Sequence, residues 1–233
     1  MDSAPPSWPR AVVFDLDGTL VDSAPDIMTA LNATLAADAL APFDVERVKT
    51  MVGGGSRRLI ERALVAHGES AKTSRVDRLV DIFEAVYADN PCRDTRIFPG
   101  AVALMETLAA RGVRLGMCTN KPGVVTLRLL EALDLARHFG AVVTGSDGLA
   151  KKPDAAMLAA TFAKLGCTAD EGIMIGDSAA DVGCARAAGC PVVLVSFGYT
   201  QEPAAVLGAD AVVDSFDAIE AILQTLHRSH MRA

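Results

Sequence analysis

The sequence has little of what marks membrane, secreted or nucleic-acid-binding proteins. No apolar run approaches the roughly 18 residues that a membrane helix needs. The opening residues MDSAPPSWPR lack the apolar stretch of a secretory signal. Basic residues are outnumbered, with 22 Lys and Arg against 29 Asp and Glu and a net charge of −7, which repels phosphate backbones. We therefore expect a soluble, cytoplasmic protein without a nucleic-acid or membrane partner.

Paired cysteines are also lacking. The five cysteines are an odd number, and they form neither a Cys-x-x-Cys pair nor a zinc-like pattern with histidine. This usage is typical of reduced thiols in a cytosolic protein and argues against a redox role. What is present is apolar material: 51% of the 233 residues are hydrophobic, which is enough for a buried core.

Short apolar segments alternate with helical patterns along most of the chain. Each segment is rich in β-branched residues, and several of them end in polar residues, as expected of buried strands that stop at functional loops. The predicted strands are 10–17, 113–120, 141–147, 171–178, 191–196 and 209–215, and the helices between them are 101–111, 124–133, 155–165, 179–188 and 216–227. This alternation predicts an α/β fold with a doubly wound, mostly parallel sheet.

One stretch breaks the alternation. Between about residues 23 and 90 there is no convincing strand, and four helical patterns cover 25–37, 44–51, 57–67 and 75–89. We expect a core domain of residues 1–22 and 93–233, and a helical bundle of residues 23–92 inserted as a cap. The connections near 21–24 and 92–99 would act as paired hinges, so that the cap lies over the carboxyl ends of the strands.

Local signals suggest where the cap helices begin and end. Asp44 and Ser56 are expected to be N-caps, because their short polar side chains can accept hydrogen bonds from the first turn. His67 and Gly68 are expected to end the third helix.

Two carboxylates stand at the end of the first predicted strand. Asp15 and Asp17 share one face of that strand and lead directly into Gly18 and Thr19. Like charges this close repel each other unless a cation or a shared proton offsets them. Asp and Gly also form ordinary turns after strands, but this five-residue pattern is rare by chance.

Three further polar clusters follow at matching positions. Residues 119–121 (Thr-Asn-Lys) end the second strand of the sheet, 151–153 (Lys-Lys-Pro) precede a helix, and 176–181 (Gly-Asp-Ser-Ala-Ala-Asp) end another strand. Taken singly, 119–121 and 176–181 could be ordinary loops with a helix N-cap, and the lysines of 151–153 could be ordinary surface residues. Together they would meet at one rim of a parallel sheet, and oxygen ligands without His or Cys favour Mg²⁺.

These clusters resemble, in order and spacing, the four motifs of the haloacid-dehalogenase-like superfamily. The resemblance covers nearly the whole chain, and the stretches 98–112, 118–122 and 196–200 look most like those of phosphoglycolate phosphatases. Ala155 departs from that pattern, since many relatives carry a second proline there.

The resemblance implies roles for the four clusters. Asp15 would attack phosphorus to form an aspartyl-phosphate, and Asp17 would act as general acid and then base. Asp15, Asp17 through its backbone carbonyl, and Asp177 would ligate Mg²⁺, with Asp181 completing the metal site by orienting bound water or the nearby lysine.

The phosphoryl group would be held by polar groups of the same loops. Thr119, Asn120 and backbone amides near Gly18 would bind its oxygens, and Lys152 would offset its charge. Thr119 and Lys152 are thus counted with the catalytic residues.

In the cap, residues 53–57 (Gly-Gly-Gly-Ser-Arg) are predicted to form a loop that leads into a helix. Gly54, Gly55 and Arg57 could meet a small carboxylate, although the segment could equally be a plain helix connection. The expected partner is a small phosphorylated metabolite, most simply 2-phosphoglycolate, bound by a monomer or a homodimer.

Several alternatives stay open at this stage. N-acetylmuramate 6-phosphate phosphatases, pyrophosphatases and β-phosphoglucomutases share every catalytic motif seen here. A haloacid dehalogenase would not be expected to carry an acid at position 17, and a phosphonatase usually has a small residue there. A non-catalytic phospho-ligand protein would generally have lost Asp15 or Asp17.

Overall fold

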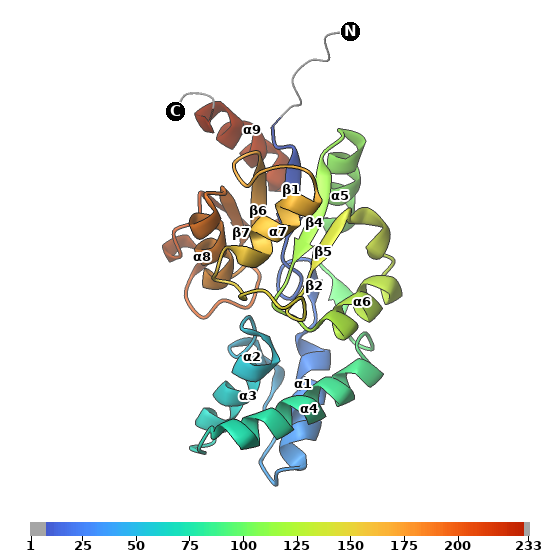
Figure 1. Ribbon diagram of the computed structural model, residues 1–233, viewed down its shortest axis with the longest axis vertical. Coiled ribbons are helices and arrows are strands. Elements are labelled where there is room, and N and C mark those ends of the chain that lie inside the picture. Colours follow the sequence, from blue (N-terminus) through green and yellow to red (C-terminus); the bar gives the residue numbers. More distant parts are fainter. Residues whose placement is uncertain (1–7, 231–233) are drawn as a thin grey trace.

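A six-stranded parallel sheet forms the centre of the protein in the computed structural model, which describes residues 8–230 (Figure 1). The strand order is β5-β4-β1-β6-β7-β8. The strands are β1 (Ala11–Phe14), β4 (Arg114–Cys118), β5 (Ala141–Val143), β6 (Gly172–Gly176), β7 (Val192–Val195) and β8 (Ala211–Val213). The chain proceeds outward from β1 on one side and then on the other, so a crevice opens at the carboxyl ends of the central strands.

Helices cover both faces of this sheet, which confirms the doubly wound α/β fold. The sheet helices are α5 (Ala101–Ala110), α6 (Gly123–Ala132), α7 (Ala156–Lys164), α8 (Ala179–Ala188) and α9 (Ile219–His230), with 3₁₀ turns at Ala136–His138, Ala204–Val206 and Phe216–Ala218. Side chains alternate along β1: Val12 and Phe14 pack in the core with α5 and α9, and Val13 packs in the core with α7 and α8.

Four helices gather below the sheet in Figure 1. They are α1 (Ala24–Ala36), α2 (Val45–Lys49), α3 (Gly55–Ala66) and α4 (Thr73–Asp89). Their apolar faces form a separate cluster, in which Leu79, Phe83 and Tyr87 follow one another at every fourth residue of α4 and are at most 2% exposed. The bundle is therefore built on its own hydrophobic core; its bounds at residues 23 and 92 stay a prediction.

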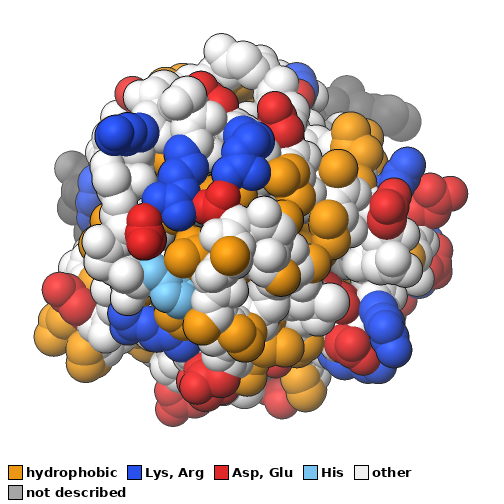
Figure 2. All heavy atoms as spheres, turned by 90° about the horizontal axis from the view of Figure 1, so that it is seen from below, with side chains coloured by type: hydrophobic (Ala, Val, Ile, Leu, Met, Phe, Trp, Pro, Cys, Tyr) orange, Lys and Arg blue, Asp and Glu red, His pale blue; other side chains and the backbone are white. Residues whose placement is uncertain are grey.

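The end of the molecule formed by this bundle carries charges of both signs. Figure 2 shows acidic, basic and apolar side chains interspersed there. Asp38, for example, forms ion pairs with Arg75 and Arg78. Partly exposed pairs of this kind each stabilise the fold by about 1 kcal/mol or less. Among the described residues no helix has both the length and the apolar character to cross a membrane.

The predicted helix ends are partly right. Asp44 caps α2 by accepting a hydrogen bond from the Arg47 amide at 2.7 Å, and α3 ends at His67 with Gly68 at a φ of +72°. Ser56 does not cap a helix, contrary to prediction. Gly54 is the N-cap of α3, and Ser56 lies within the first turn with its hydroxyl buried.

The two connections between sheet and bundle pair with each other. β2 (Val21–Asp22) and β3 (Arg96–Ile97) form a two-stranded antiparallel ribbon at the position where the sequence predicts hinges. Strands of two residues are too short to produce a hydrophobic alternation, so the sequence pattern contained no signal for them.

Asp26, in the first turn of α1, binds the segment through which the chain returns from the helical bundle to the sheet. Its carboxylate is 4% exposed and accepts hydrogen bonds from the backbone amides of Arg93, Asp94 and Thr95, at 2.8 to 3.0 Å. The Thr95 hydroxyl donates a further bond at 2.6 Å. A single buried carboxylate thus fixes the segment that leads into β3.

Replacing Asp26 with alanine should destabilise the protein substantially, because several buried donors would lose their acceptor at once. We expect the free energy of unfolding in urea to fall by about 3 kcal/mol. Asp81→Ala, at an exposed position of α4, serves as the control and should change it by about 0.5 kcal/mol or less. Equal stability of the two variants would contradict this role for Asp26.

Candidate active site

The predicted site residues come from loops that follow the central strands. Asp15 follows β1 directly, and the chain then turns back tightly, with Leu20 and Val21 donating to the Leu16 carbonyl. Gly18 has a φ of +81°, and a β-carbon there would lie 2.4 Å from a carboxylate oxygen of Asp177. This position therefore requires glycine, because the β1 loop crosses directly over the β6 loop.

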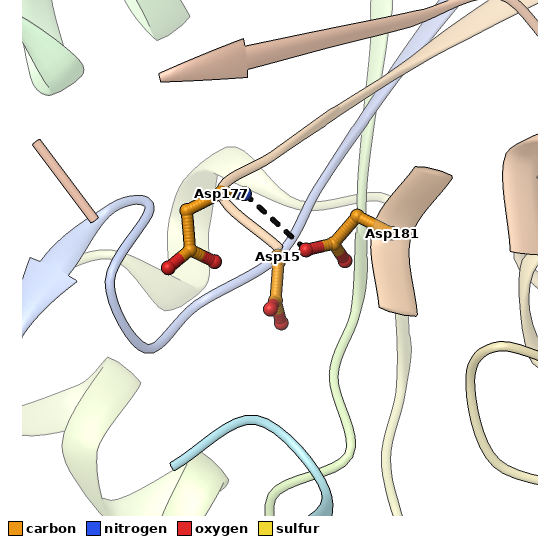
Figure 3. A group of neighbouring side chains, drawn as sticks. All are labelled: Asp15, Asp177 and Asp181. Atoms are coloured by element: carbon orange, nitrogen blue, oxygen red, sulfur yellow. Dashed lines mark hydrogen bonds between the residues drawn. The ribbon is translucent and has the colours of Figure 1, made fainter. Parts of the chain in front are cut away.

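Three carboxylates meet where these loops cross. Asp15, Asp177 and Asp181 each offer an oxygen within 4.8 Å of the others, and they are 7%, 2% and 0% exposed (Figure 3). Burial raises the pKa of Asp15 to about 6, with Lys152 lowering it and Asp181 raising it. Burial likewise raises the pKa of Asp177, and the charges of Asp181 and Asp15 add to the effect. The cluster therefore holds more negative charge than its surroundings compensate.

Lys152 is the positive group within this cluster. Its ammonium lies 2.9 Å from Asp15 Oδ1 and 2.7 Å from Asp181 Oδ1, and the residue is 4% exposed. Burial opposes the charged form of Lys152, but the attraction of Asp15 and Asp181 outweighs burial and raises its pKa well above the ordinary value. Lys152 is thus a permanently charged ammonium facing Asp15.

The oxygen atoms of Asp181 are largely occupied. Oδ2 accepts from the Ser178 hydroxyl at 2.7 Å and from the amides of Ser178 and Asp177 at 3.1 and 3.2 Å, the last of these drawn in Figure 3. The bond from the Ser178 amide is part of a capping box at the start of α8, while Oδ1 accepts a hydrogen bond from Lys152. Asp181 therefore orients the loop and the lysine.

Asp177 is contacted from two sides, and its oxygens accept fewer hydrogen bonds than those of Asp181. The Tyr199 amide donates to Oδ2 at 2.6 Å, and the Thr19 hydroxyl approaches Oδ1 at 3.4 Å. The same tyrosine reaches the cap: its hydroxyl accepts from the Ala24 amide at 3.0 Å and donates to Asp22 at 2.5 Å. One residue thus connects this carboxylate to β2 and to the first turn of α1.

The donor set suits a hard divalent cation. Three buried carboxylates face one ammonium, and Asp15 Oδ1 has no partner with hydrogen-bond geometry although Lys152 is near. Oxygen donors alone, without His or Cys, are the ligands of Mg²⁺-type ions. A bound cation would remove the repulsion that raises the carboxylate pKa values.

Asp17 lies apart from this group of three carboxylates. It accepts from the Ser23 hydroxyl at 2.5 Å and forms an ion pair with Lys121 Nζ at 2.9 and 3.1 Å. Lys121 also donates to the Tyr87 hydroxyl at 2.7 Å. Sequence reasoning noted Lys121 beside Thr119 and Asn120 but gave it no role, because nothing local shows that its side chain reaches Asp17.

Thr119 and Asn120 stand at the end of β4, as predicted. The amide group of Asn120 donates to the carbonyls of Gly53 and Lys152 at 3.0 and 3.1 Å, and its oxygen accepts from the Lys152 amide at 3.0 Å. The Asn120 side chain therefore joins the lysine loop to the cap, and both of its N–H donors are used for that purpose.

Several of the predicted residues line one of two hollows where the cap meets the sheet, whereas Gly18, Asp177 and Asp181 line neither. Asp15, Asp17, Thr119, Asn120 and Gly55 line a small cavity of about 40 Å³, whose cap side includes the apolar Ile27, Leu59 and Phe83. Gly54 and Arg57 instead line a wider hollow of about 790 Å³ together with Lys151 and Lys152. Arg57 forms an ion pair with Asp77 of α4. The structure does not bring Arg57 to the cavity that contains Asp15.

The chain is similar to known proteins along most of its length. The haloacid dehalogenase-like hydrolase family matches residues 12–195. A phosphoglycolate phosphatase of Rhodospirillum rubrum is 48% identical over 215 residues, covering 91% of this chain and 89% of that protein. One from Caulobacter vibrioides is 43% identical over 205 residues, covering 88% and 86%.

Solved structures give the same result for the fold. A predicted phosphoglycolate phosphatase from Haemophilus somnus superposes with a TM-score of 0.83 at 29% identity, covering 91% of this chain and 97% of that one. Family match, relatives and fold agree over nearly the whole length. The chain therefore belongs to the haloacid dehalogenase-like hydrolases.

Proposed function

We propose that the protein is a Mg²⁺-dependent phosphatase that hydrolyses 2-phosphoglycolate through an aspartyl-phosphate on Asp15. The observation that carries this proposal is the placement of Asp15: a carboxylate at a strand end, beside a buried ammonium and two further carboxylates. Relatives named phosphoglycolate phosphatase, identical at up to 48% over most of the chain, support the substrate.

Asp15 is the nucleophile. One of its oxygens attacks phosphorus in line, and the bond from phosphorus to the leaving alkoxide breaks. Lys152 offsets the charge that Asp15 and the phosphoryl oxygens bring together. Thr119, Asn120 and the backbone near Gly18 are proposed to position the phosphoryl group, Asn120 by fixing the loop that carries Lys152.

Asp17 moves the protons. It donates one to the departing alkoxide, and it then accepts one from the water that attacks the aspartyl-phosphate, which releases inorganic phosphate and restores Asp15. Ser23 and Lys121 hold its carboxylate in place between the hinge and the rim of the sheet.

Asp15, Asp177 and the Asp17 backbone carbonyl would hold Mg²⁺, with Asp181 supporting the site. When bound, the ion supplies charge stabilisation for the phosphoryl oxygens. The capping role of Asp181 and its bond to Lys152 support a positioning function for this residue.

Cavity size supports a small substrate. About 40 Å³ leaves room for only a few water-sized groups. A two-carbon phosphoester is closer to this size than a hexose phosphate is, and the relatives named phosphoglycolate phosphatase favour it over the mutase alternative. Gly55 stays a proposed contact for the rest of the substrate because it lines this cavity, whereas Gly54 and Arg57 line the wider hollow. We propose a cytoplasmic monomer or homodimer.

A panel of phosphomonoesters tests the substrate. With Mg²⁺ present, kcat/KM for phosphate release from 2-phosphoglycolate should exceed kcat/KM for hexose phosphates, amino-sugar phosphates and pyrophosphate. A higher kcat/KM for any of these would overturn the assignment. Phosphate that moves between sugar positions without release would indicate a mutase instead.

Replacing Asp15 with asparagine should reduce kcat for phosphate release by roughly 10⁴-fold, because the amide oxygen cannot attack phosphorus effectively. Asp81→Asn on the exposed face of α4 is the matched control and should retain full turnover. Circular dichroism would verify that both variants are folded. Undiminished hydrolysis by the Asp15 variant would mean that another atom attacks.

Adding Mg²⁺ should raise the melting temperature, because the ion binds the folded carboxylate cluster and not the unfolded chain. At 100 times the dissociation constant the gain is about 2.7 kcal/mol. The rise should shrink in Asp177→Asn. Sodium chloride at equal ionic strength is the control for screening; if it matched the effect of Mg²⁺, binding at this cluster would be refuted. Chelation with EDTA should stop phosphate release.

A further inference from the structure

Lys121 is a buried cation that so far has only a positioning role, beside Asp17, and no proposed contact with the substrate. The residue is 4% exposed, and its ammonium lies 4.4 Å from the centre of the Tyr87 ring as well as against Asp17. Among the described residues that line the small cavity beside Asp15, Lys121 provides the only positive charge. An ammonium has three N–H donors, and the Lys121 ammonium lies within hydrogen-bond distance of both oxygens of Asp17 and of the Tyr87 hydroxyl. A substrate carboxylate would therefore take over one of the two bonds that now go to Asp17.

Ser56 provides an unsatisfied polar group on the cap side of the same cavity. Its hydroxyl is buried without a hydrogen-bond partner, and the residue is 4% exposed. A buried hydroxyl without a partner costs about 1–3 kcal/mol, so its retention at the cavity wall needs a reason. Ser56 also lies in the first turn of α3, where backbone N–H groups are free and the helix end is positive.

Tyr87 contributes the third polar group. It lies on α4 of the cap, is 2% exposed, and accepts a hydrogen bond from Lys121. Accepting this bond leaves its own O–H hydrogen free to donate. The rest of the cap wall is apolar, with Ile27, Leu59 and Phe83 in the cavity lining.

We propose that Lys121, Ser56 and Tyr87 form the subsite that binds the carboxylate of the substrate, the end that is not transferred. The proposal rests on the proposed function and names the residues that determine its specificity. Each group donates hydrogen bonds, one is cationic, and all three line the cavity that contains Asp15 and Asp17. A carboxylate accepts such bonds at both oxygens and would give Ser56 its missing partner.

This subsite differs from the one that the sequence suggests. Arg57 is paired with Asp77 and lines the wider hollow, so it would have to leave its partner to reach the cavity. Lys121 is already at the cavity wall. Because one of its contacts comes from α4 and the other from the loop after β1, the subsite is complete only when cap and sheet are together.

The test compares 2-phosphoglycolate with ethyl phosphate, which replaces the carboxylate by a methyl group. In Lys121→Met, kcat/KM for phosphoglycolate should fall at least 20-fold more than kcat/KM for ethyl phosphate, mainly through KM. Ser56→Ala and Tyr87→Phe should each lower the ratio of kcat/KM for phosphoglycolate to kcat/KM for ethyl phosphate about 5-fold. Lys164→Met on α7 and Ser74→Ala on α4, both at exposed positions, are the matched controls and should keep the wild-type ratio.

The outcomes separate the two proposals. If wild-type protein hydrolyses ethyl phosphate as well as phosphoglycolate, both the proposed substrate and this subsite are wrong. If the wild type prefers phosphoglycolate but Lys121→Met lowers kcat/KM for both substrates by the same factor, only the subsite is wrong. Lys121 would then act solely by positioning Asp17. A preference that survives in Lys121→Met and Ser56→Ala but is lost in Arg57→Ala would also overturn the subsite.

Discussion

Electrostatic repulsion among buried carboxylates is the constraint on which the rest of the structure depends. Asp15, Asp177 and Asp181 lie within 4.8 Å of one another and are almost fully buried, and Lys152 is the ammonium that lies between two of them. Such an arrangement costs free energy, and the fold supplies it through packing elsewhere. The uncompensated negative charge makes the site ready for a cation, and it would repel an anionic phosphoryl group unless such a cation were bound.

Much of the fold could be predicted because its elements carry local signals. The strand ending at Asp15 and the helix 179–188 follow from apolar runs and 3.6-residue periodicity, and both lie within a few residues of their predicted bounds. The meeting of the four loops followed from topology, since parallel strands place their carboxyl ends at one rim. Asp15, Lys152 and Asp177 are therefore found together as expected.

The parts that could not be predicted depend on pairing between segments far apart in the sequence. Lys121 reaches Asp17, which is 104 residues away, and Asn120 contacts Gly53 across the junction with the cap. The β2–β3 ribbon has two residues per strand and no periodicity to detect. Ser56 looked like an N-cap because serine often is one, whereas the local backbone begins the helix at Gly55. In each case tertiary contacts decided the outcome.

Tyr199 links the β6 loop to the start of the helical bundle. Its amide binds the carboxylate of Asp177 while its hydroxyl binds both the first turn of α1 and Asp22 of the ribbon. The side chain is 8% exposed, so surrounding atoms leave it little freedom to swing. The residue that holds this carboxylate is therefore also the one that fixes where the helical bundle begins, so the position of the β6 loop and the start of α1 are set by the same side chain and backbone.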